Sequence, residues 1–369
     1  MHPAIIKGWD LPKEEYAEAH QQNRLVKLVT ELSNVCNLSC PGCFTKRDEG
    51  TWDEKSKKRL PDELSYENQI ALIEEAKMLG VKVVDIVGAG EPTLDKNFEP
   101  FVGYLTDAGL QTVIFTHGAS PRFKKLVELW KNDPVSFFVK LWSQDPLLQQ
   151  RYVGGSVLDY AIKRDAALET LIQDGYTQGE EVIVDGIPYK TTRVGADILV
   201  MQSNLSEIPD LFRFCRIHNI MPEIKTYIPE GPTLFSQNLA QTRYSAEELI
   251  VLRKDEVSPA EFLELRHELE RIDQEEFGIE KMHTVYPQAV KCTQSMASVY
   301  VTITGDIRSC VGTQGSYGKY EAGKGMLAKV IKERRERVGF GCVPRLEDSE
   351  KRALLLPEDL RKIYSDGMQ

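Results

Sequence analysis

The chain has 369 residues, a formal net charge of −10 and a pI near 5.3. This length allows one large domain and a smaller one, and the acidic balance argues against a protein that coats nucleic acid. The first residues lack the apolar core of an export signal, and no apolar run reaches the length of a membrane span. We therefore expect a cytoplasmic protein whose seven cysteines are reduced and bind metal rather than form disulfides.

A polar N-terminal extension precedes a regular alternation of strands and helices. Apolar and β-branched runs predict six strands, at 24–32, 81–87, 111–116, 136–142, 194–201 and 222–228. Amphipathic segments predict the helices between them, at 65–79, 98–108, 122–131, 157–173 and 207–218. Six consecutive βα units require a parallel sheet with helices outside and a ligand site at the carboxyl ends of the strands. We therefore predict an α/β fold with a parallel sheet of six strands.

Two hairpins are predicted outside this alternation. Glu181–Val184 and Ile187–Lys190 flank Asp185-Gly186, a strong turn signal, and this insertion is either part of a lid or a solvated decoration. Further on, residues 300–309 alternate around Gly305-Asp306 in the same manner. Cys292 and Cys310 bracket the second hairpin.

Three cysteines, Cys36, Cys40 and Cys43, follow the first predicted strand in a single loop. Tetrahedral zinc usually takes four protein ligands in a structural site, and this loop offers three. A 4Fe–4S cube held by three thiolates keeps one iron free for another ligand. A zinc loop or a purely structural iron–sulfur loop remains the alternative.

The C-x3-C-x2-C spacing after a first strand resembles the radical S-adenosylmethionine (radical SAM) enzymes. The resemblance implies that the six strands form a partial (β/α)6 TIM-like barrel and that the free iron binds SAM. Gly88-Ala89-Gly90-Glu91-Pro92, after the second strand, is similar to the GGEP motif of that family, whose segment binds the methionine amino group. The family usually has a large residue immediately before the third cysteine, where this chain has Gly42, and Phe44 is the candidate to cover the adenine instead.

The same resemblance implies SAM contacts at the ends of successive strands. The expected set is Phe44, Gly88, Gly90, Glu91, Pro92, Thr116, Ser143, Asn204 and Ile228. Asn204 could equally cap the helix that follows it. His117 departs from the Thr-Asn-Gly that the family has at this place, and it either faces the cofactor or serves the turn. The catalytic residue is unknown, and the candidates are His117, Asp145 and Tyr227.

Three further cysteines, Cys292, Cys310 and Cys342, lie in the C-terminal part of the chain. Gly305 and Cys310 form a G-x4-C element that resembles the SPASM and twitch domains, which carry an auxiliary iron–sulfur cluster. The resemblance implies a second cluster held by these three cysteines, and buried cysteines without metal are the alternative. Cys215 lies in an apolar helical segment and is expected in the core.

These interpretations divide the chain into five parts. They are an extension at 1–23, the radical SAM barrel at 24–235, a helical connector at 236–283, a twitch-like cluster domain at 284–348 and a C-terminal helix at 349–369.

The implied activity is reductive cleavage of SAM to a 5′-deoxyadenosyl radical that takes hydrogen from a small-molecule substrate, with flavodoxin or ferredoxin as the electron donor. Only 35 residues precede Cys36, which favours a small molecule over a peptide. A peptide maturase is the alternative enzyme, and a non-catalytic electron-transfer or metal-binding protein is the alternative of another class.

Overall fold

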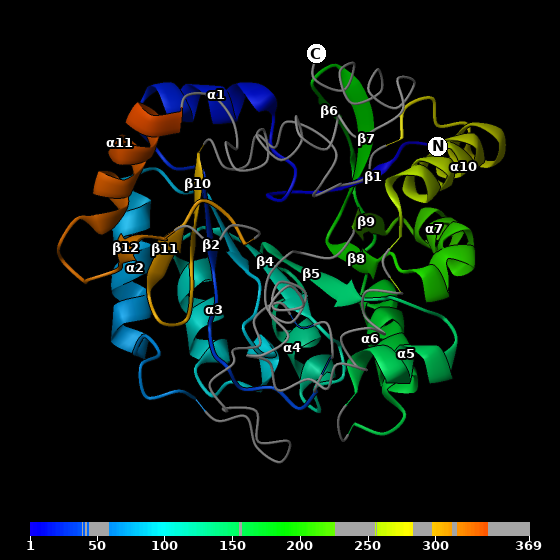
Figure 1. Ribbon diagram of the computed structural model, residues 1–369, viewed down its shortest axis with the longest axis horizontal. Coiled ribbons are helices and arrows are strands. Elements are labelled where there is room, and N and C mark those ends of the chain that lie inside the picture. The colour runs from blue at the N-terminus through cyan, green and yellow to red at the C-terminus, as the bar shows by residue number, and fades with distance from the viewer. Residues whose placement is uncertain are drawn as a thin grey trace.

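The computed structural model describes residues 1–38, 40, 43, 59–154, 157–225, 255, 257–282, 297–311 and 316–338. Within them, six parallel strands stand side by side in their order along the chain (Figure 1). They are β2 Lys27–Thr30, β3 Val83–Ile86, β4 Gln111–Thr116, β5 Val135–Lys140, β8 Val194–Leu199 and β9 Met221–Lys225. The predicted parallel sheet is thereby confirmed. Among the described strands the sheet stays open, because β9 and β12 form its two edges.

Helices follow the strands as predicted, with one addition. The predicted ones are α2 Tyr66–Met78, α3 Phe98–Asp107, α4 Phe123–Leu129, α6 Tyr160–Gln173 and α7 Ile208–Ile217. Ser65 caps α2, since its side chain accepts a hydrogen bond from the Asn68 amide. The addition is α5 Pro146–Val153, where Asp145 is the N-cap. No helix in the described part of the chain is long and apolar enough to cross a membrane.

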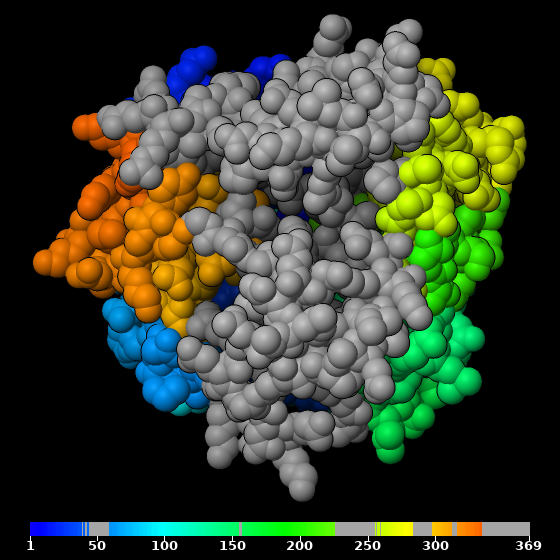
Figure 2. Space-filling model, viewed as in Figure 1, coloured from blue at the N-terminus to red at the C-terminus, as the bar shows by residue number. Residues whose placement is uncertain are grey.

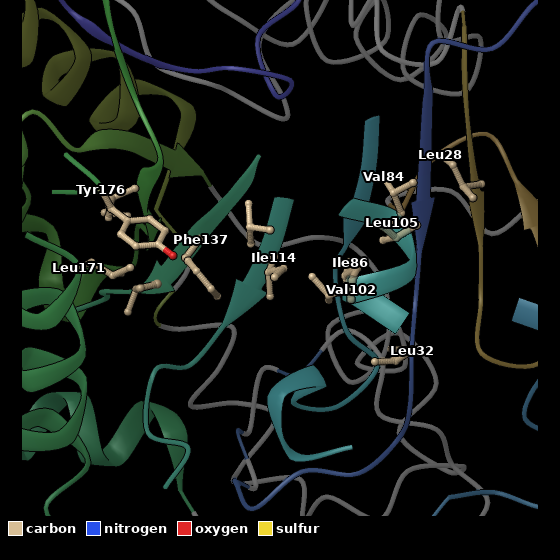
Figure 3. Packing of buried hydrophobic residues seen from close by; sticks show 14 of the residues in the cluster. Leu28, Leu32, Val84, Ile86, Val102, Leu105, Ile114, Phe137, Leu171 and Tyr176 are labelled. Carbon is tan, nitrogen blue, oxygen red and sulfur yellow. The ribbon is translucent and has the colours of Figure 1, made fainter. Parts of the chain in front are cut away.

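The outer face of the sheet and these helices share one apolar core. Figure 3 shows Val84 and Ile86 of β3 beside Val102 and Leu105 of α3, and all four side chains are buried. Burying an aliphatic side chain of this size contributes about 1.5–3 kcal/mol. Because successive side chains of a strand point to opposite faces, this core also determines which residues remain on the inner face.

The N-terminal segment fills the inner face at the amino ends of the strands. Its strand β1 (Ala4–Ile6) and Trp9 pack in a second apolar cluster with residues from four barrel strands: Val83, Val113, Phe138 and Met221. The Trp9 ring lies 5.2 Å from that of Phe115 and 5.0 Å from that of Phe138. The segment was predicted as a polar extension, and the structure shows that it completes the core.

The first predicted hairpin is confirmed as β6 Glu181–Val184 and β7 Ile187–Thr192. β7 pairs in parallel with β1, so the hairpin joins the N-terminal segment in a three-stranded sheet (Figure 1). β8 begins at Val194, directly after β7 ends, which places the hairpin at the amino ends of the barrel strands. A lid over the carboxyl ends is therefore the wrong interpretation of this insertion.

The second predicted hairpin is confirmed as β10 Ser298–Val301 and β11 Asp306–Arg308. It was not foreseen that β10 pairs in parallel with β2, so that β10, β11 and β12 Ser316–Lys319 extend the barrel sheet. The buried Glu31 accepts hydrogen bonds from the Tyr300 hydroxyl and the Ile303 amide across this junction.

The remaining helices are α1 Lys13–Gln21, α10 Pro259–Phe277 and α11 Met326–Val338. Ser258 caps α10 through the amide of Glu261, in agreement with the predicted interruption at Ser258-Pro259. Figure 2 shows α11 and the C-terminal strands on one side of this face of the molecule and α10 on the other.

We expect Trp9→Ala to destabilise the fold, because the substitution removes the ring that fills the inner face beneath Phe115 and Phe138. The expected loss is about 3–5 kcal/mol in the free energy of unfolding, measured with urea. Met78→Ala, at a side chain that is 81% exposed, is the matched control and should change little. A loss in the Trp9 variant no larger than in the control would contradict the packing role.

Candidate active site

The cysteine loop is joined to the glycine segment after β3 by backbone hydrogen bonds. The amide of Leu32 donates to the Gly88 carbonyl at 3.0 Å, and the Gly90 amide donates to the Ser33 carbonyl at 2.8 Å. A Cβ on Gly90 would lie 2.2 Å from the carbonyl oxygen of Val35, so only glycine allows this approach. The glycine motif therefore holds the chain immediately before Cys36.

The three loop cysteines lie against an apolar cluster made by Leu38, Ala119, Val153, Val157 and Tyr160. Cys40 is buried, and Cys36 and Cys43 are half-buried. The Lys140 ammonium lies 3.5 Å from the Cys40 sulfur. Burial alone would lower the pKa of Lys140, but negative charge at Cys40, Asp197 and the other two thiols raises it overall.

Three thiols in one loop are a donor set that fits an iron–sulfur cube, with one iron left for another ligand. In the described part of the chain, no three His, Cys, Asp or Glu side chains converge on a point where one metal ion could bind. A cube holds each thiolate on a different iron, so its ligands lie further apart than those of a single ion. A neighbouring ammonium stabilises thiolates, which are the form that binds iron.

The Glu91 carboxylate, which is 2% exposed, lies at the centre of the site. Its Oε1 accepts hydrogen bonds from the hydroxyls of Thr93 at 2.5 Å and Thr116 at 2.6 Å. Its Oε2 accepts one from the His117 amide at 2.8 Å. Glu91 thus joins the segment after β3 to the end of β4, and its Oε2 has the capacity to accept a further hydrogen bond, for example from an ammonium group.

His117, which is 4% exposed, connects this carboxylate to the cysteine loop. Its Nε2 lies 2.7 Å from the side-chain oxygen of Asn37 and 3.5 Å from Glu91 Oε2. The Tyr160 hydroxyl donates to the His117 carbonyl at 2.8 Å. The ring is enclosed by protein groups, so His117 is a positioning candidate rather than a group that reacts with substrate.

Ser143 is fully buried at the end of β5, and its hydroxyl donates to the Glu207 carboxylate at 2.7 Å. The Arg164 guanidinium donates to the Ser143 carbonyl at 3.1 Å, while its Nη2 is buried without a hydrogen-bond partner. A buried guanidinium N–H without a partner is costly, and a carboxylate would satisfy it well.

The phenol of Tyr160 lies close to charged groups from three segments of the chain: Arg164, Cys40 and Glu91. Burial raises the pKa of Tyr160 well above its usual value. Arg164 opposes that shift, while negative charge at Cys40 and Glu91 adds to it. Charges from the cysteine loop, the glycine segment and α6 therefore act on one ring.

Two of the predicted residues have structural roles. Asn204 is fully buried, and its amide donates to the carbonyls of Trp142 and Leu199 while its oxygen accepts from the Met201 amide. Asn204 lies within a short 3-10 helix, Gln202–Glu207, and the N-cap of the following helix α7 is Glu207, so Asn204 does not cap α7. Its polar atoms are used by the backbone, which does not support a contact with SAM. Asp145 is exposed and caps α5 through the amides of Leu147 and Leu148, which does not support a catalytic role.

Several predicted residues lie outside the described ranges: Phe44, Tyr227, Ile228, Cys292 and Cys342. Cys310 is described and half-buried, two residues beyond the end of β11.

The sequence analysis did not identify a row of charged residues on the inner face of the sheet. Lys140, Asp197 and Glu223 are aligned partners on the adjacent strands β5, β8 and β9, and therefore point to the same face. The Lys225 ammonium lies 2.8 Å from Asp197 and 3.1 Å from Glu223. The signal that could have revealed them is a charge at inward positions of otherwise apolar strands.

A second charged pair lies deeper, near the N-terminal segment. The Lys27 ammonium is 3.3 Å from the Asp85 carboxylate, and both side chains are at most 1% exposed. Lys27 also donates to the Trp9 carbonyl at 3.0 Å. Burial raises the pKa of Asp85 to about 6, and the charge of Lys27 opposes the shift.

The chain is similar to known proteins in sequence and in fold. Residues 30–164 match the family model described as the radical SAM superfamily. The structure of Streptococcus suis SuiB bound to S-adenosylmethionine is 15% identical with a TM-score of 0.58, covering 90% of this chain and 71% of that one. SuiB bound to its precursor peptide SuiA is also 15% identical with a TM-score of 0.58, over 86% and 68%.

A curated relative also matches. Fe-coproporphyrin III synthase of Methanosarcina barkeri (strain Fusaro / DSM 804) is 29% identical over 91 residues, which are 25% of this chain and 21% of that protein. The matched segment thus spans about a fifth of the length of this relative.

The three-cysteine loop lies within the matched segment, residues 30–164, which is less than half of the chain. This segment is similar to the radical SAM superfamily, and the match indicates an enzyme. The family implies a 4Fe–4S cluster and SAM as cofactors.

We expect Glu223→Gln to remove part of the pH dependence of stability. Burial raises the pKa of Glu223 to about 7 from its ordinary value of 4.5, with Lys225 opposing the shift. The folded state therefore binds the extra proton, so wild-type stability falls as the pH rises from about 4.5 to about 7.

The difference in urea unfolding free energy between about pH 5 and about pH 8 should shrink in this variant, by an amount on the order of 1–3 kcal/mol. The exposed Glu128, changed to Gln, is the control and should keep the wild-type difference. An unchanged difference in the Glu223 variant would refute the raised pKa.

Proposed function

We propose that this enzyme cleaves SAM reductively at a cluster held by Cys36, Cys40 and Cys43 and uses the resulting radical to take hydrogen from a polar small molecule. When bound, the cluster supplies the electron that breaks a carbon–sulfur bond of SAM and so generates a 5′-deoxyadenosyl radical. The observation that carries the proposal is the loop of three thiols, joined through Gly90 to the buried Glu91 carboxylate.

The described residues suit the two ends of the amino acid part of SAM. Glu91 Oε2 could accept a hydrogen bond from the ammonium group, in line with the glycine motif. The unpartnered Nη2 of Arg164 would receive the carboxylate, next to Ser143. The apolar cluster around Leu38 and Tyr160 buries Cys40 and shields one side of the other two thiols, which helps to protect a reactive radical.

The inner face of the sheet favours a polar substrate. Lys140 lies within 3.5 Å of the Cys40 sulfur and belongs to the same row as Asp197 and Glu223. An apolar substrate on this face would strip water from charged groups without replacing their contacts, which is unfavourable.

A peptide substrate is the second candidate. SuiB, whose solved structure contains its precursor peptide SuiA, has a similar fold. At 15% identity, the similarity to SuiB supports a shared fold and says nothing about the substrate. A peptide is therefore a second substrate class to be assayed beside small molecules.

Replacing any of the three loop cysteines by Ala should abolish SAM cleavage, since two thiolates do not hold the cube in a loop. The measurement is 5′-deoxyadenosine formed by the anaerobically reconstituted protein, with dithionite in place of the natural donor, for which a flavodoxin or ferredoxin is proposed.

The control for this experiment is Cys215→Ala. Cys215 is fully buried in α7, where burial raises the pKa of its thiol to about 12, and it packs in the helix core. This variant should keep its iron and its activity. Full activity in any loop variant would refute the proposal, and a wild-type protein that holds a cluster but never cleaves SAM would indicate an electron-transfer protein.

We also propose a second cluster held by Cys310 together with Cys292 and Cys342. Cys310 directly follows the described hairpin, whose predicted G-x4-C element motivates the assignment. Such a cluster would either accept an electron from the substrate radical or bind the substrate at an open iron.

The triple variant with Cys36, Cys40 and Cys43 changed to Ala should retain about half of the iron, about four of eight atoms per chain. Iron and sulfide analysis, with an electron paramagnetic resonance (EPR) spectrum of the reduced protein, measures this. A colourless, iron-free triple variant would leave the C-terminal cysteines as structural residues.

A further inference from the structure

The side chain of His117 spans the distance between the cysteine loop and the glycine segment. Its backbone amide donates to Glu91 Oε2 at 2.8 Å, and the far nitrogen of its ring lies 2.7 Å from the side-chain oxygen of Asn37. Asn37 directly follows Cys36, whose sulfur accepts a hydrogen bond from the Leu38 amide at 3.4 Å. One residue therefore contacts both halves of the site.

The hydrogen bonds determine which ring nitrogen carries the proton. The amide of Ala119 donates to Nδ1 at 2.9 Å, so Nδ1 is an acceptor. In the neutral imidazole the proton then lies on Nε2, which donates to the Asn37 oxygen. The Tyr160 hydroxyl holds the His117 carbonyl at 2.8 Å, so both the backbone and the ring are fixed.

The turn after β4 does not require an imidazole. The bond from the Ala119 amide to Nδ1 is of the kind that an Asn or Asp side chain makes in an Asx-turn. The imidazole adds a second polar atom farther from the backbone, and that atom reaches Asn37. The contact with the cysteine loop is therefore separable from the turn by substitution.

We propose that His117 is a positioning residue that holds the cysteine loop at a fixed separation from Glu91 through its bond to Asn37. The consequence for the reaction rests on the proposed function, because that separation sets where the cluster lies relative to the ammonium group of SAM. The bond itself is a property of the chain and is measurable without either cofactor.

The test separates the two ring nitrogens. His117→Asn keeps an acceptor near Nδ1 for the Ala119 amide but does not reach Asn37, whereas His117→Gln places an amide N–H toward Asn37. Asn37→Ala removes the other partner, and the double variant with His117→Asn completes a thermodynamic cycle. His218→Asn is the control, because His218 is the C-cap of α7 and contacts Phe214, away from both loops.

The first measurement is amide hydrogen exchange of residues 34–38 in the cluster-free chain. The second is SAM affinity and the change that SAM causes in the EPR spectrum of the reduced cluster, with iron content measured alongside. We expect His117→Asn and Asn37→Ala to exchange faster and to bind SAM about fivefold more weakly at unchanged iron content, as for one lost hydrogen bond. The double variant should be no worse than either single one, and His117→Gln should recover most of the affinity.

A His117→Asn protein with wild-type exchange and wild-type SAM affinity would overturn the proposal and leave His117 as a turn residue. Additive effects in the double variant would also overturn it. If the His117 variants do not fold, the Asn37→Ala protein tests the proposal instead. Wild-type amide exchange and wild-type SAM affinity in that protein would overturn it. A wild-type chain that fails to bind SAM would refute the proposed function, while the exchange experiment would still decide whether His117 holds the loop.

Discussion

Burial of the Glu91 carboxylate organises the site. A carboxylate that is 2% exposed is tolerated only where donors surround it, and here they come from Thr93, Thr116 and His117. These donors lie at the ends of β3 and β4, so satisfying one charge aligns two strand ends. The backbone bonds between 32–35 and 88–91 then extend the alignment to the chain before Cys36. The position of the cysteine loop is thus a consequence of where one negative charge is placed.

The inner face of the sheet differs between its two ends for a related reason. At the amino ends, Trp9 fills the space, and the Lys27–Asp85 pair beneath it is closed to solvent. At the carboxyl ends, the side chains of Asp197 and Lys225 are 14% and 15% exposed. The closed pair contacts only protein groups, whereas the accessible one also interacts with whatever occupies that end. Among the described residues, the accessible charges of this row therefore lie on the side of the cysteine loop.

The sequence predicted the features that depend on local pattern. Strand and helix alternation reproduced the six-strand order, and the turn signals at Asp185-Gly186 and Gly305-Asp306 located both hairpins. The spacing of the cysteines and the glycine segment predicted the family. Each of these is determined within a few residues, where turn chemistry and periodicity act.

What the sequence did not reveal depends on contacts between distant segments. The pairing of β1 with β7 and of β10 with β2 joins chain ends to strands far along the sequence, and no local pattern specifies such register. The same holds for Asn204, whose amide is used by the carbonyls of Trp142 and Leu199. The sequence around a polar residue at a strand end is the same whether its side chain binds a ligand or the backbone of a neighbouring strand.

The arrangement of charge also links the cysteine loop to the inner face of the sheet. Lys140 belongs to the inner row with Asp197 and also lies 3.5 Å from the Cys40 sulfur, so the row begins beside the cysteine loop. An ammonium between two such groups responds to the charge of both, because charges within a few ångström interact strongly in a buried site. A change of charge at the loop would therefore act on the inner row through this one side chain.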